Sequence, residues 1–100
     1  MNNYEAMFIF QPSLNEEELA KLVSLISEKI TQTEGKIQDT QDLGKKKLAF
    51  EIKKQKEGFY YLMNFETKPE AQKILKEAFR LNESILRVLI LKKDSLQNIK

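Results

Sequence analysis

The stretch that decides the fold is residues 59–65, Phe59-Tyr60-Tyr61-Leu62-Met63-Asn64-Phe65. Large apolar side chains occupy both alternating sets of positions, as is typical of a strand whose two faces are both covered. A polar segment, Lys53–Gly58, precedes this strand, and before it Leu48, Phe50 and Ile52 recur with the two-residue period of a second strand. Two such strands joined by a polar turn predict a β-hairpin.

The segments before this hairpin predict a helix followed by an extension of the second strand. Residues 36–42 continue the strand pattern, and Gly44 indicates a bulge or bend. Helical spacing predicts a helix over residues 16–32, with Asn15 as its N-cap and Gly35 ending it. Its first turn holds three glutamates. We interpret them as charges that interact favourably with the helix dipole rather than as a metal or acid/base cluster. The expected buried stripe of this helix is Leu19, Leu22, Val23, Ile26 and Ile30.

The two ends of the chain complete the pattern. Residues 4–10 and 85–91 are apolar strands, and Pro69 suits the first turn of a second helix. Its expected stripe is Ala71, Ile74, Leu75, Ala78 and Phe79. The order β-α-β-β-α-β predicts an α+β, ferredoxin-like fold with a four-stranded antiparallel sheet and both helices on one face. We expect one domain over residues 1–94 and a short C-terminal tail over residues 95–100.

Composition excludes several classes of function. The chain has no cysteine and no histidine, which removes thiol chemistry, thiolate metal sites and the commonest general base. We therefore expect no catalytic residues, metal or other cofactor, and no small-molecule substrate. No apolar run approaches the ~20 residues that cross a bilayer, so we expect a cytoplasmic protein that does not bind membranes. The net charge of +2 is a weak argument for nucleic acid by itself.

Strand parity predicts an apolar surface on the sheet face opposite the helices. The core set, toward the helices, is Ala6, Phe8, Phe10, Tyr61, Met63, Phe65, Val88 and Ile90. The remaining apolar positions of the same strands are Met7, Ile9, Tyr60, Leu62, Leu89 and Leu91. Monomers seldom leave such a patch exposed, so we expect a protein partner to cover it. An imprecise parity assignment is the alternative, although a uniform slip exchanges the two sets and leaves both apolar.

Three stretches carry a resemblance to a known family. They are Tyr4-Glu5-Ala6-Met7-Phe8-Ile9 with Pro12 after it, Leu43-Gly44-Lys45-Lys46-Lys47-Leu48-Ala49-Phe50-Glu51-Ile52 followed by Lys54 and Gly58, and Asn82-Glu83-Ser84-Ile85-Leu86-Arg87. In this order and spacing, over nearly the whole length, the chain resembles the family of ribosomal protein six of the bacterial small subunit. The resemblance implies a structural protein of the ribosome that binds the central domain of 16S ribosomal RNA as a heterodimer with small-subunit protein eighteen. Asn2 and Asn3 stand where the family often has basic residues, which implies little RNA contact from the N-terminus.

Cationic side chains at strand ends are the expected RNA contacts, because they can reach phosphates without entering the core. The candidates are Arg87, Lys92, Lys93, Lys54 and Lys56, with Arg80 behind them as a helix C-terminal cation. Arg87 is the leading candidate, since parity places it on the open face, where a guanidinium can pair with phosphate or stack on a base. Its alternative role is a surface ion pair with Glu5. For Lys45–Lys47, an RNA or partner contact and a solvated strand edge both remain open.

Two other functions use the same strand order. An RNA-recognition motif stacks bases on aromatics of its third strand, and residues 57–64 partly resemble that pattern. Glu57, Tyr60 and Asn64 depart from it at the basic, small and final aromatic positions. An acylphosphatase-like enzyme needs an arginine in the loop after the first strand, and residues 11–15 contain none.

Overall fold

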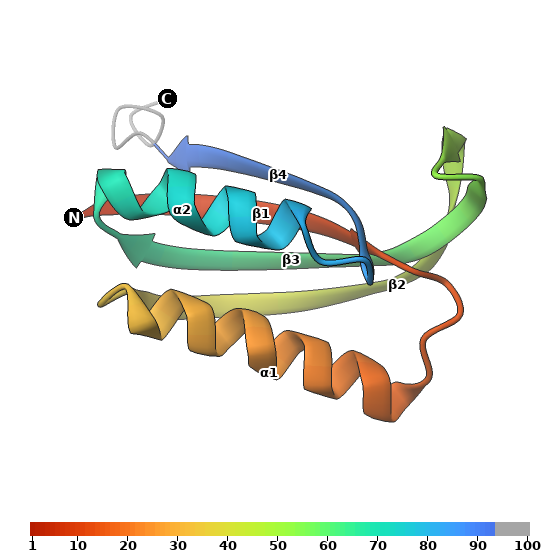
Figure 1. Ribbon diagram of the computed structural model, residues 1–100, viewed down its shortest axis with the longest axis horizontal. Helices are drawn as coiled ribbons and strands as arrows, with labels where there is room; N and C mark the ends of the chain where they lie inside the picture. Colours follow the sequence, from red (N-terminus) through yellow and green to blue (C-terminus); the bar gives the residue numbers. More distant parts are fainter. Residues whose placement is uncertain (94–100) are drawn as a thin grey trace.

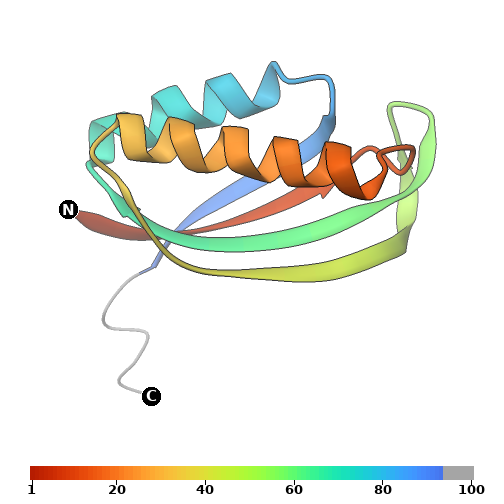
Figure 2. The ribbon, with the colours of Figure 1, turned by 90° about the horizontal axis from the view of Figure 1, so that it is seen from below.

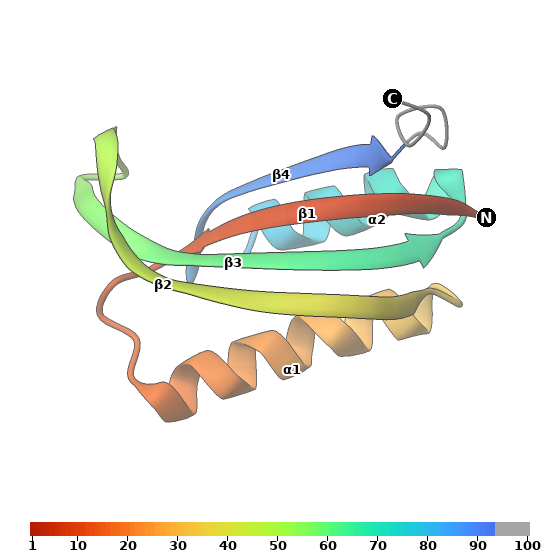
Figure 3. The same cartoon turned by 180° about the vertical axis from the view of Figure 1, so that it is seen from behind.

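The computed structural model describes residues 1–93 and has the expected ferredoxin-like architecture (Figure 1). Its elements are β1 (Asn2–Phe10), α1 (Glu16–Gln32), β2 (Lys36–Ile52), β3 (Gln55–Thr67), α2 (Pro69–Arg80) and β4 (Ile85–Lys93). The strands pair antiparallel in the order β2-β3-β1-β4, and both helices lie on one face of the sheet (Figure 2). Figure 3 shows the other side, where the strands lie in front of α2. The expected tail, residues 95–100, lies outside the described residues.

The start of α1 confirms the expected cap. The Asn15 side chain accepts a 2.8 Å hydrogen bond from the Glu18 backbone N–H, and the Glu18 carboxylate accepts a 2.9 Å bond from the Asn15 N–H. This capping box satisfies two donors that the first turn leaves without helical partners. Leu22, Ile26 and Ile30 are buried against the sheet, as their spacing predicts.

The end of α1 differs from the expectation. The residue in the left-handed conformation is Glu34, with φ of 64°, and not Gly35. Glycine is nevertheless required at position 35, because a Cβ there would lie 2.6 Å from the Ile30 carbonyl oxygen and 3.0 Å from the Glu66 carbonyl oxygen. Gly35 therefore allows a close backbone approach where the chain turns into β2, rather than supplying a positive φ.

The second helix, α2, buries a narrower stripe than its sequence predicts. Pro69 opens the helix, and Ala71, Leu75 and Phe79 are buried at four-residue intervals. Ile74 is 66% exposed, so its assignment to the core is wrong: it lies to the side of this row, beyond the surface that faces the sheet. No helix within residues 1–93 is long and apolar enough to span a membrane.

The core lies between β1, β3, β4 and the two helices. Phe8, Phe10 and Phe65 are fully buried, and the Phe8 ring meets the Phe79 ring edge-on at 5.3 Å between centroids. This arrangement is one of the favoured geometries for aromatic pairs. The structure confirms the core parity, because the other members of the predicted core set also lie on this side. Ala6, Met63 and Ile90 are buried, and Tyr61 and Val88 pack partly buried against the same cluster.

The β2–β3 hairpin is longer and turns more tightly than the sequence indicates. Lys53 and Lys54 alone form the turn, and both have positive φ, at 49° and 69°. The segment Gln55–Gly58, expected within the turn, already belongs to β3. Gly44 has φ of 83° at a register shift of β2, which confirms the bulge.

Candidate partner and nucleic-acid interface

Strand register brings the predicted partner-face residues together on the side of the sheet without helices. Met7 on β1 lies opposite Leu62 on β3 and opposite Leu89 on β4. In the next row, Ile9 lies between Tyr60 and Arg87. We call the set Met7, Ile9, Tyr60, Leu62, Leu89 and Leu91 the open-face strip. Its members occupy three adjacent strands, so they form a continuous surface.

Exposure is uneven along this strip. Leu89 and Leu91 on β4 are 51% and 52% exposed, whereas Met7, Tyr60 and Leu62 are half-buried. Ile9 is only 9% exposed and is more enclosed than its parity alone predicts. The β4 end is therefore the least covered apolar part of the face.

Gly58 explains the enclosure of Ile9. A Cβ at position 58 would lie 2.6 Å from the Ile9 Cγ2 atom and 3.5 Å from a Leu86 methyl carbon. Leu86 is itself 4% exposed and falls at the register shift where β4 passes Ile9 and Phe10. Sequence periodicity did not predict that Ile9 and Leu86 lie close to Gly58, because a bulge shifts the alternation of faces in only one of two paired strands.

A polar row, absent from the sequence expectations, bounds the strip. Asp39, Asn64 and Glu5 lie side by side on β2, β3 and β1, followed by Leu91 on β4. The Asn64 side-chain nitrogen donates to an Asp39 carboxylate oxygen at 3.2 Å, while its own carbonyl oxygen is buried and accepts no hydrogen bond from residues 1–93. Buried polar groups usually find partners, so this amide is an unusual feature of the face. Its signal in the sequence is one amide inside an otherwise apolar strand.

Arg87 is exposed at the edge of the strip. It lies opposite Ile9, whereas Glu5 lies opposite Leu91, so the register separates the two charges. Within residues 1–93 the ion pairs join Lys68 to Glu34 and Arg80 to Glu77, and neither involves Arg87. The ion pair considered for Arg87 is therefore wrong, and its guanidinium lies beside an apolar surface.

The other cationic candidates lie at two opposite ends of the sheet. Lys92 and Lys93 lie opposite Tyr4 and Asn3, at the end where β1 begins. Lys54 and Lys56 belong to the hairpin at the other end (Figure 1). The sequence could not show this separation, because it depends on which strand ends meet in the sheet.

Two further cations, Lys45 and Arg80, have partners within the chain. The Lys45 ammonium lies 5.1 Å from the centroid of the Phe59 ring, a cation–π geometry. The Arg80 guanidinium lies 3.2 Å from the Glu77 carboxylate in the last turn of α2. Lys46 and Lys47 continue along the β2 edge. Lys45 and Arg80 are thus less available to an external ligand than Lys46 and Lys47.

The aromatics that an RNA-recognition motif would expose point the other way. Phe59 and Tyr61 occupy its two stacking positions on the third strand, and both pack against the core. Tyr60, at the position where that motif has a small residue, lies on the open face. The open face therefore lacks the paired stacking platform on β3, and the RNA-recognition-motif alternative fails on geometry.

Comparisons with known proteins agree with one another over almost the whole chain. Residues 3–92 match the family model described as ribosomal protein S6. A small ribosomal subunit protein bS6 of Helicobacter acinonychis is 40% identical over 99 residues, covering 99% of this chain and 70% of the relative. The bS6 of Clostridium acetobutylicum is 42% identical over 91 residues, covering 91% and 96% of the two chains.

Solved structures give the same result. The crystal structure of 30S ribosomal protein S6 from Thermotoga maritima superposes with a TM-score of 0.89 at 31% identity, covering 98% of this chain and 92% of the other. An Arabidopsis thaliana protein at 14% identity has a TM-score of 0.55, which is a likeness of fold alone.

Proposed function

Because the chain belongs to the ribosomal protein S6 family, we propose that it binds the central domain of 16S ribosomal RNA as a heterodimer with small-subunit protein eighteen. It is a component of the small ribosomal subunit and not an enzyme. The observation that carries the proposal is the open-face strip, which gives a partner protein a continuous apolar surface. We place its action in the bacterial cytoplasm, within the ribosome.

The open-face strip supports protein docking because it combines a half-buried centre with an exposed apolar edge on β4. Leu89 and Leu91 each leave about half of their surface in water. Covering apolar surface stabilises an association by about 25 cal/mol per Å² before the costs of association. Tyr60 adds a rigid aromatic with a polar tip, a type of residue enriched among interface anchors. We therefore assign the strip to the protein partner.

RNA binding is assigned to cations beside the strip and at the ends of the sheet. Arg87 is exposed next to the strip and forms no ion pair among residues 1–93. A guanidinium in that position can reach a phosphate in a bidentate way while the partner covers the apolar residues beside it. Lys92 and Lys93 at one end of the sheet, and Lys54 and Lys56 at the other, are assigned to further phosphates.

The partner assignment is tested by co-purification with tagged small-subunit protein eighteen. Leu89→Asp places a charge on the bare edge of the strip, and we expect it to abolish binding while the chain still folds. Leu81→Asp is the matched control, because Leu81 is 72% exposed and lies outside the sheet after α2. Retained binding by Leu89→Asp, or equal loss by both variants, would contradict the assignment.

The RNA assignment is tested by reconstitution with the RNA and protein eighteen. We expect Arg87→Ala to weaken assembly onto the RNA by about 1.5–3 kcal/mol, the range for hydrogen bonds to charged groups. Arg87→Lys restores part of the affinity, because a lysine keeps the charge but not the planar fork. Arg80→Ala, which removes the exposed cation paired with Glu77, is the control. Unchanged assembly by Arg87→Ala would show that this residue does not contact the RNA.

A further inference from the structure

The tip of the β2–β3 hairpin projects past the rest of the sheet. The last residue of β1, Phe10, lies opposite Phe59, so within the described residues 1–93 the earlier part of β3 has no strand on its β1 side. We call residues 47–57 the hairpin tip. It lies at the end of the molecule away from the N-terminus and the end of β4 (Figure 1). The proposed partner and RNA contacts assign only Lys54 and Lys56 in it.

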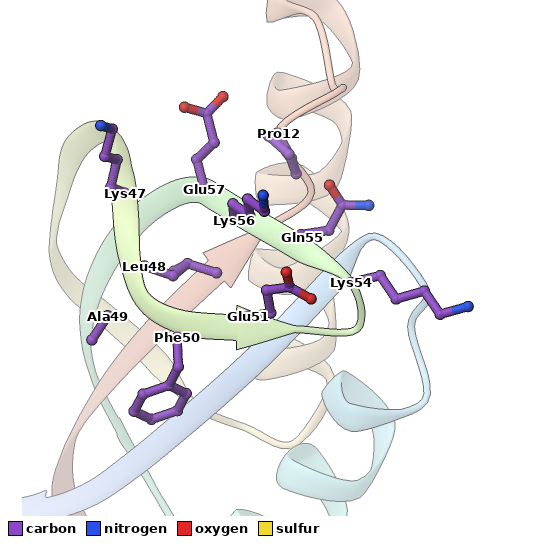
Figure 4. A pocket seen from close by; sticks show the side chains of 10 residues that line it. All are labelled: Pro12, Lys47, Leu48, Ala49, Phe50, Glu51, Lys54, Gln55, Lys56 and Glu57. Carbon is purple, nitrogen blue, oxygen red and sulfur yellow. The ribbon is translucent and has the colours of Figure 1, made fainter.

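The hairpin tip contains a large bulge that presents an aromatic ring to solvent. Lys47 pairs with Glu57 and Ile52 pairs with Gln55, so residues 48–51 of β2 lie against Lys56 alone. In Figure 4 the bulge bends β2, with Leu48 inside the bend and Ala49 and Phe50 on its outer side. Phe50 is 68% exposed, although full burial of a phenylalanine side chain is worth about 1.5–3 kcal/mol. Bulges often re-aim side chains next to functional sites.

The hairpin tip and the lysine run before it form the most basic segment of the chain. Residues 45–57 contain six lysines and two glutamates, a net charge of +4, whereas the whole chain carries +2. The rest of the protein is therefore slightly acidic. In Figure 4 the Lys54 side chain extends outward from the turn end of the hairpin. The charge of this segment favours a polyanion and disfavours a basic protein as the molecule that meets Phe50.

The turn itself is built from residues that seldom adopt its conformation. Lys53 and Lys54 have φ of 49° and 69°, a geometry that usually selects asparagine, aspartate or glycine in two-residue hairpins. Such strain persists where surrounding structure imposes it, and it concentrates at functional positions. Here its effect is to place two cations at the outermost point of the hairpin.

We propose that the hairpin tip binds an unpaired nucleotide of an RNA strand, with the Phe50 ring stacked on the base and Lys47, Lys54 and Lys56 on the flanking phosphates. The proposal rests on the proposed function for the identity of the polymer as RNA, and adds a recognition chemistry and a place. An open hollow of about 770 Å³ runs along the tip, lined by residues that include Pro12, Leu48 and Phe50. Stacking on an exposed ring tolerates any base, because every base has a π-face. The site therefore selects unpaired over paired RNA rather than one sequence.

A fluorescence experiment tests the stacking directly. The chain has no tryptophan, so Phe50→Trp introduces a single reporter at the proposed contact. We expect a ten-residue oligoadenylate to quench this tryptophan, and an abasic phosphodiester chain of the same length to leave it unchanged. Leu81→Trp, at another highly exposed position, is the control and should respond to neither. Quenching of both variants alike, or no quenching of Phe50→Trp at saturating oligoadenylate, would overturn the proposal.

Affinity measurements separate stacking from charge. By fluorescence anisotropy, Phe50→Ala should weaken binding of labelled oligoadenylate by roughly tenfold and leave the abasic chain unaffected. Lys54→Gln should weaken both probes to the same degree and reduce the salt dependence. Equal affinity of the unmodified protein for the two probes would show that no base is recognised.

The outcome for the partner protein distinguishes this proposal from the proposed function. If Phe50→Ala abolishes co-purification of protein eighteen and base quenching is absent, the hairpin tip is a protein contact. In that case the stacking proposal fails, while the assignments of Leu89 and Arg87 stand on their own tests. If Leu89→Asp and Arg87→Ala have no effect but Phe50→Trp is quenched by oligoadenylate, the partner assignment of Leu89 and the RNA assignment of Arg87 both fail. The nucleotide site at Phe50 remains in that case.

Discussion

Neighbouring residues of β3 should respond in opposite ways to the same substitution, because they point to opposite faces. Met63 is fully buried among the core aromatics, and Leu62 is half-buried on the open face. Met63→Asp removes a buried side chain worth about 1.5–3 kcal/mol and adds the desolvation of a carboxylate. The total, at least about 4 kcal/mol, is comparable with the whole stability of many domains. Leu62→Asp loses about half of one such burial, or about 1 kcal/mol.

Thermal melts followed by circular dichroism, with co-purification of protein eighteen, measure both effects. For a domain of this size, a loss of 1 kcal/mol lowers Tm by about 4–8 °C, so Leu62→Asp should still unfold cooperatively. It should also fail to bind the partner, whereas Met63→Asp should show no cooperative transition at all. A folded Met63→Asp beside an unfolded Leu62→Asp would refute the parity. If both variants fold and bind normally, the open face has no docking role.

Three smaller predictions concern the scaffold, each measured by denaturant unfolding or thermal melts. Asn15→Ala should cost about 1 kcal/mol by removing the cap of α1, with Asn15→Asp as the control that keeps it. Gly58→Ala should lower the free energy of unfolding by about 1–3 kcal/mol, because the new Cβ would lie 2.9 Å from a β1 carbonyl oxygen. An unchanged stability would show that the β1 backbone can shift to make room for the methyl group. The ion pair with Lys68 lowers the pKa of Glu34 through a side-chain hydrogen bond and charge, so its stabilisation is present above the unfolded pKa and is lost as pH falls through the folded one. Glu34→Gln should therefore remove a small decrease in Tm that develops as pH falls below about 5, toward and below the unfolded glutamate pKa, and an unchanged pH profile would show that the pair contributes nothing.

Features set by local periodicity were predictable from the sequence. The α1 stripe and the inward parity of Met63 follow from repeats of 3.6 and 2.0 residues, and the cap at Asn15 follows from the residue types at Asn15 and Glu18. The open-face strip follows as well, because once Met63 faces the helices, Tyr60 and Leu62 must face away. These features depend on positions a few residues apart, where chain geometry leaves little freedom.

Features set by contacts between distant segments were not predictable. Ile74 has helical spacing for the core, yet it lies beside the buried row Ala71, Leu75 and Phe79 and is exposed. The Asn64–Asp39 hydrogen bond depends on the register between β3 and β2, which several bulges shift. Leu86 is buried at a bulge of β4, opposite the end of β1. Periodicity placed Phe50 on the same face as Leu48 and Ile52. Phe50 is exposed instead, because residues 48–51 of β2 lie against the single residue Lys56 of β3.

The geometry of the sheet also limits how one RNA molecule can contact the lysines at both ends of the sheet. Lys92 and Lys93 lie where β1 begins, and the hairpin tip lies beyond where β1 ends. The nine residues of β1, at about 3.3 Å each, separate the two sites by roughly 30 Å. A short single strand bound at Phe50 leaves the β4 lysines free, whereas a folded RNA that spans the sheet can contact both ends. The isolated chain should therefore bind short RNA weakly and with a modest salt slope, since few phosphates are engaged at once. We expect affinity to rise only when a partner on the open-face strip fixes the RNA fold in place, so that its phosphates meet Arg87 and both ends of the sheet together.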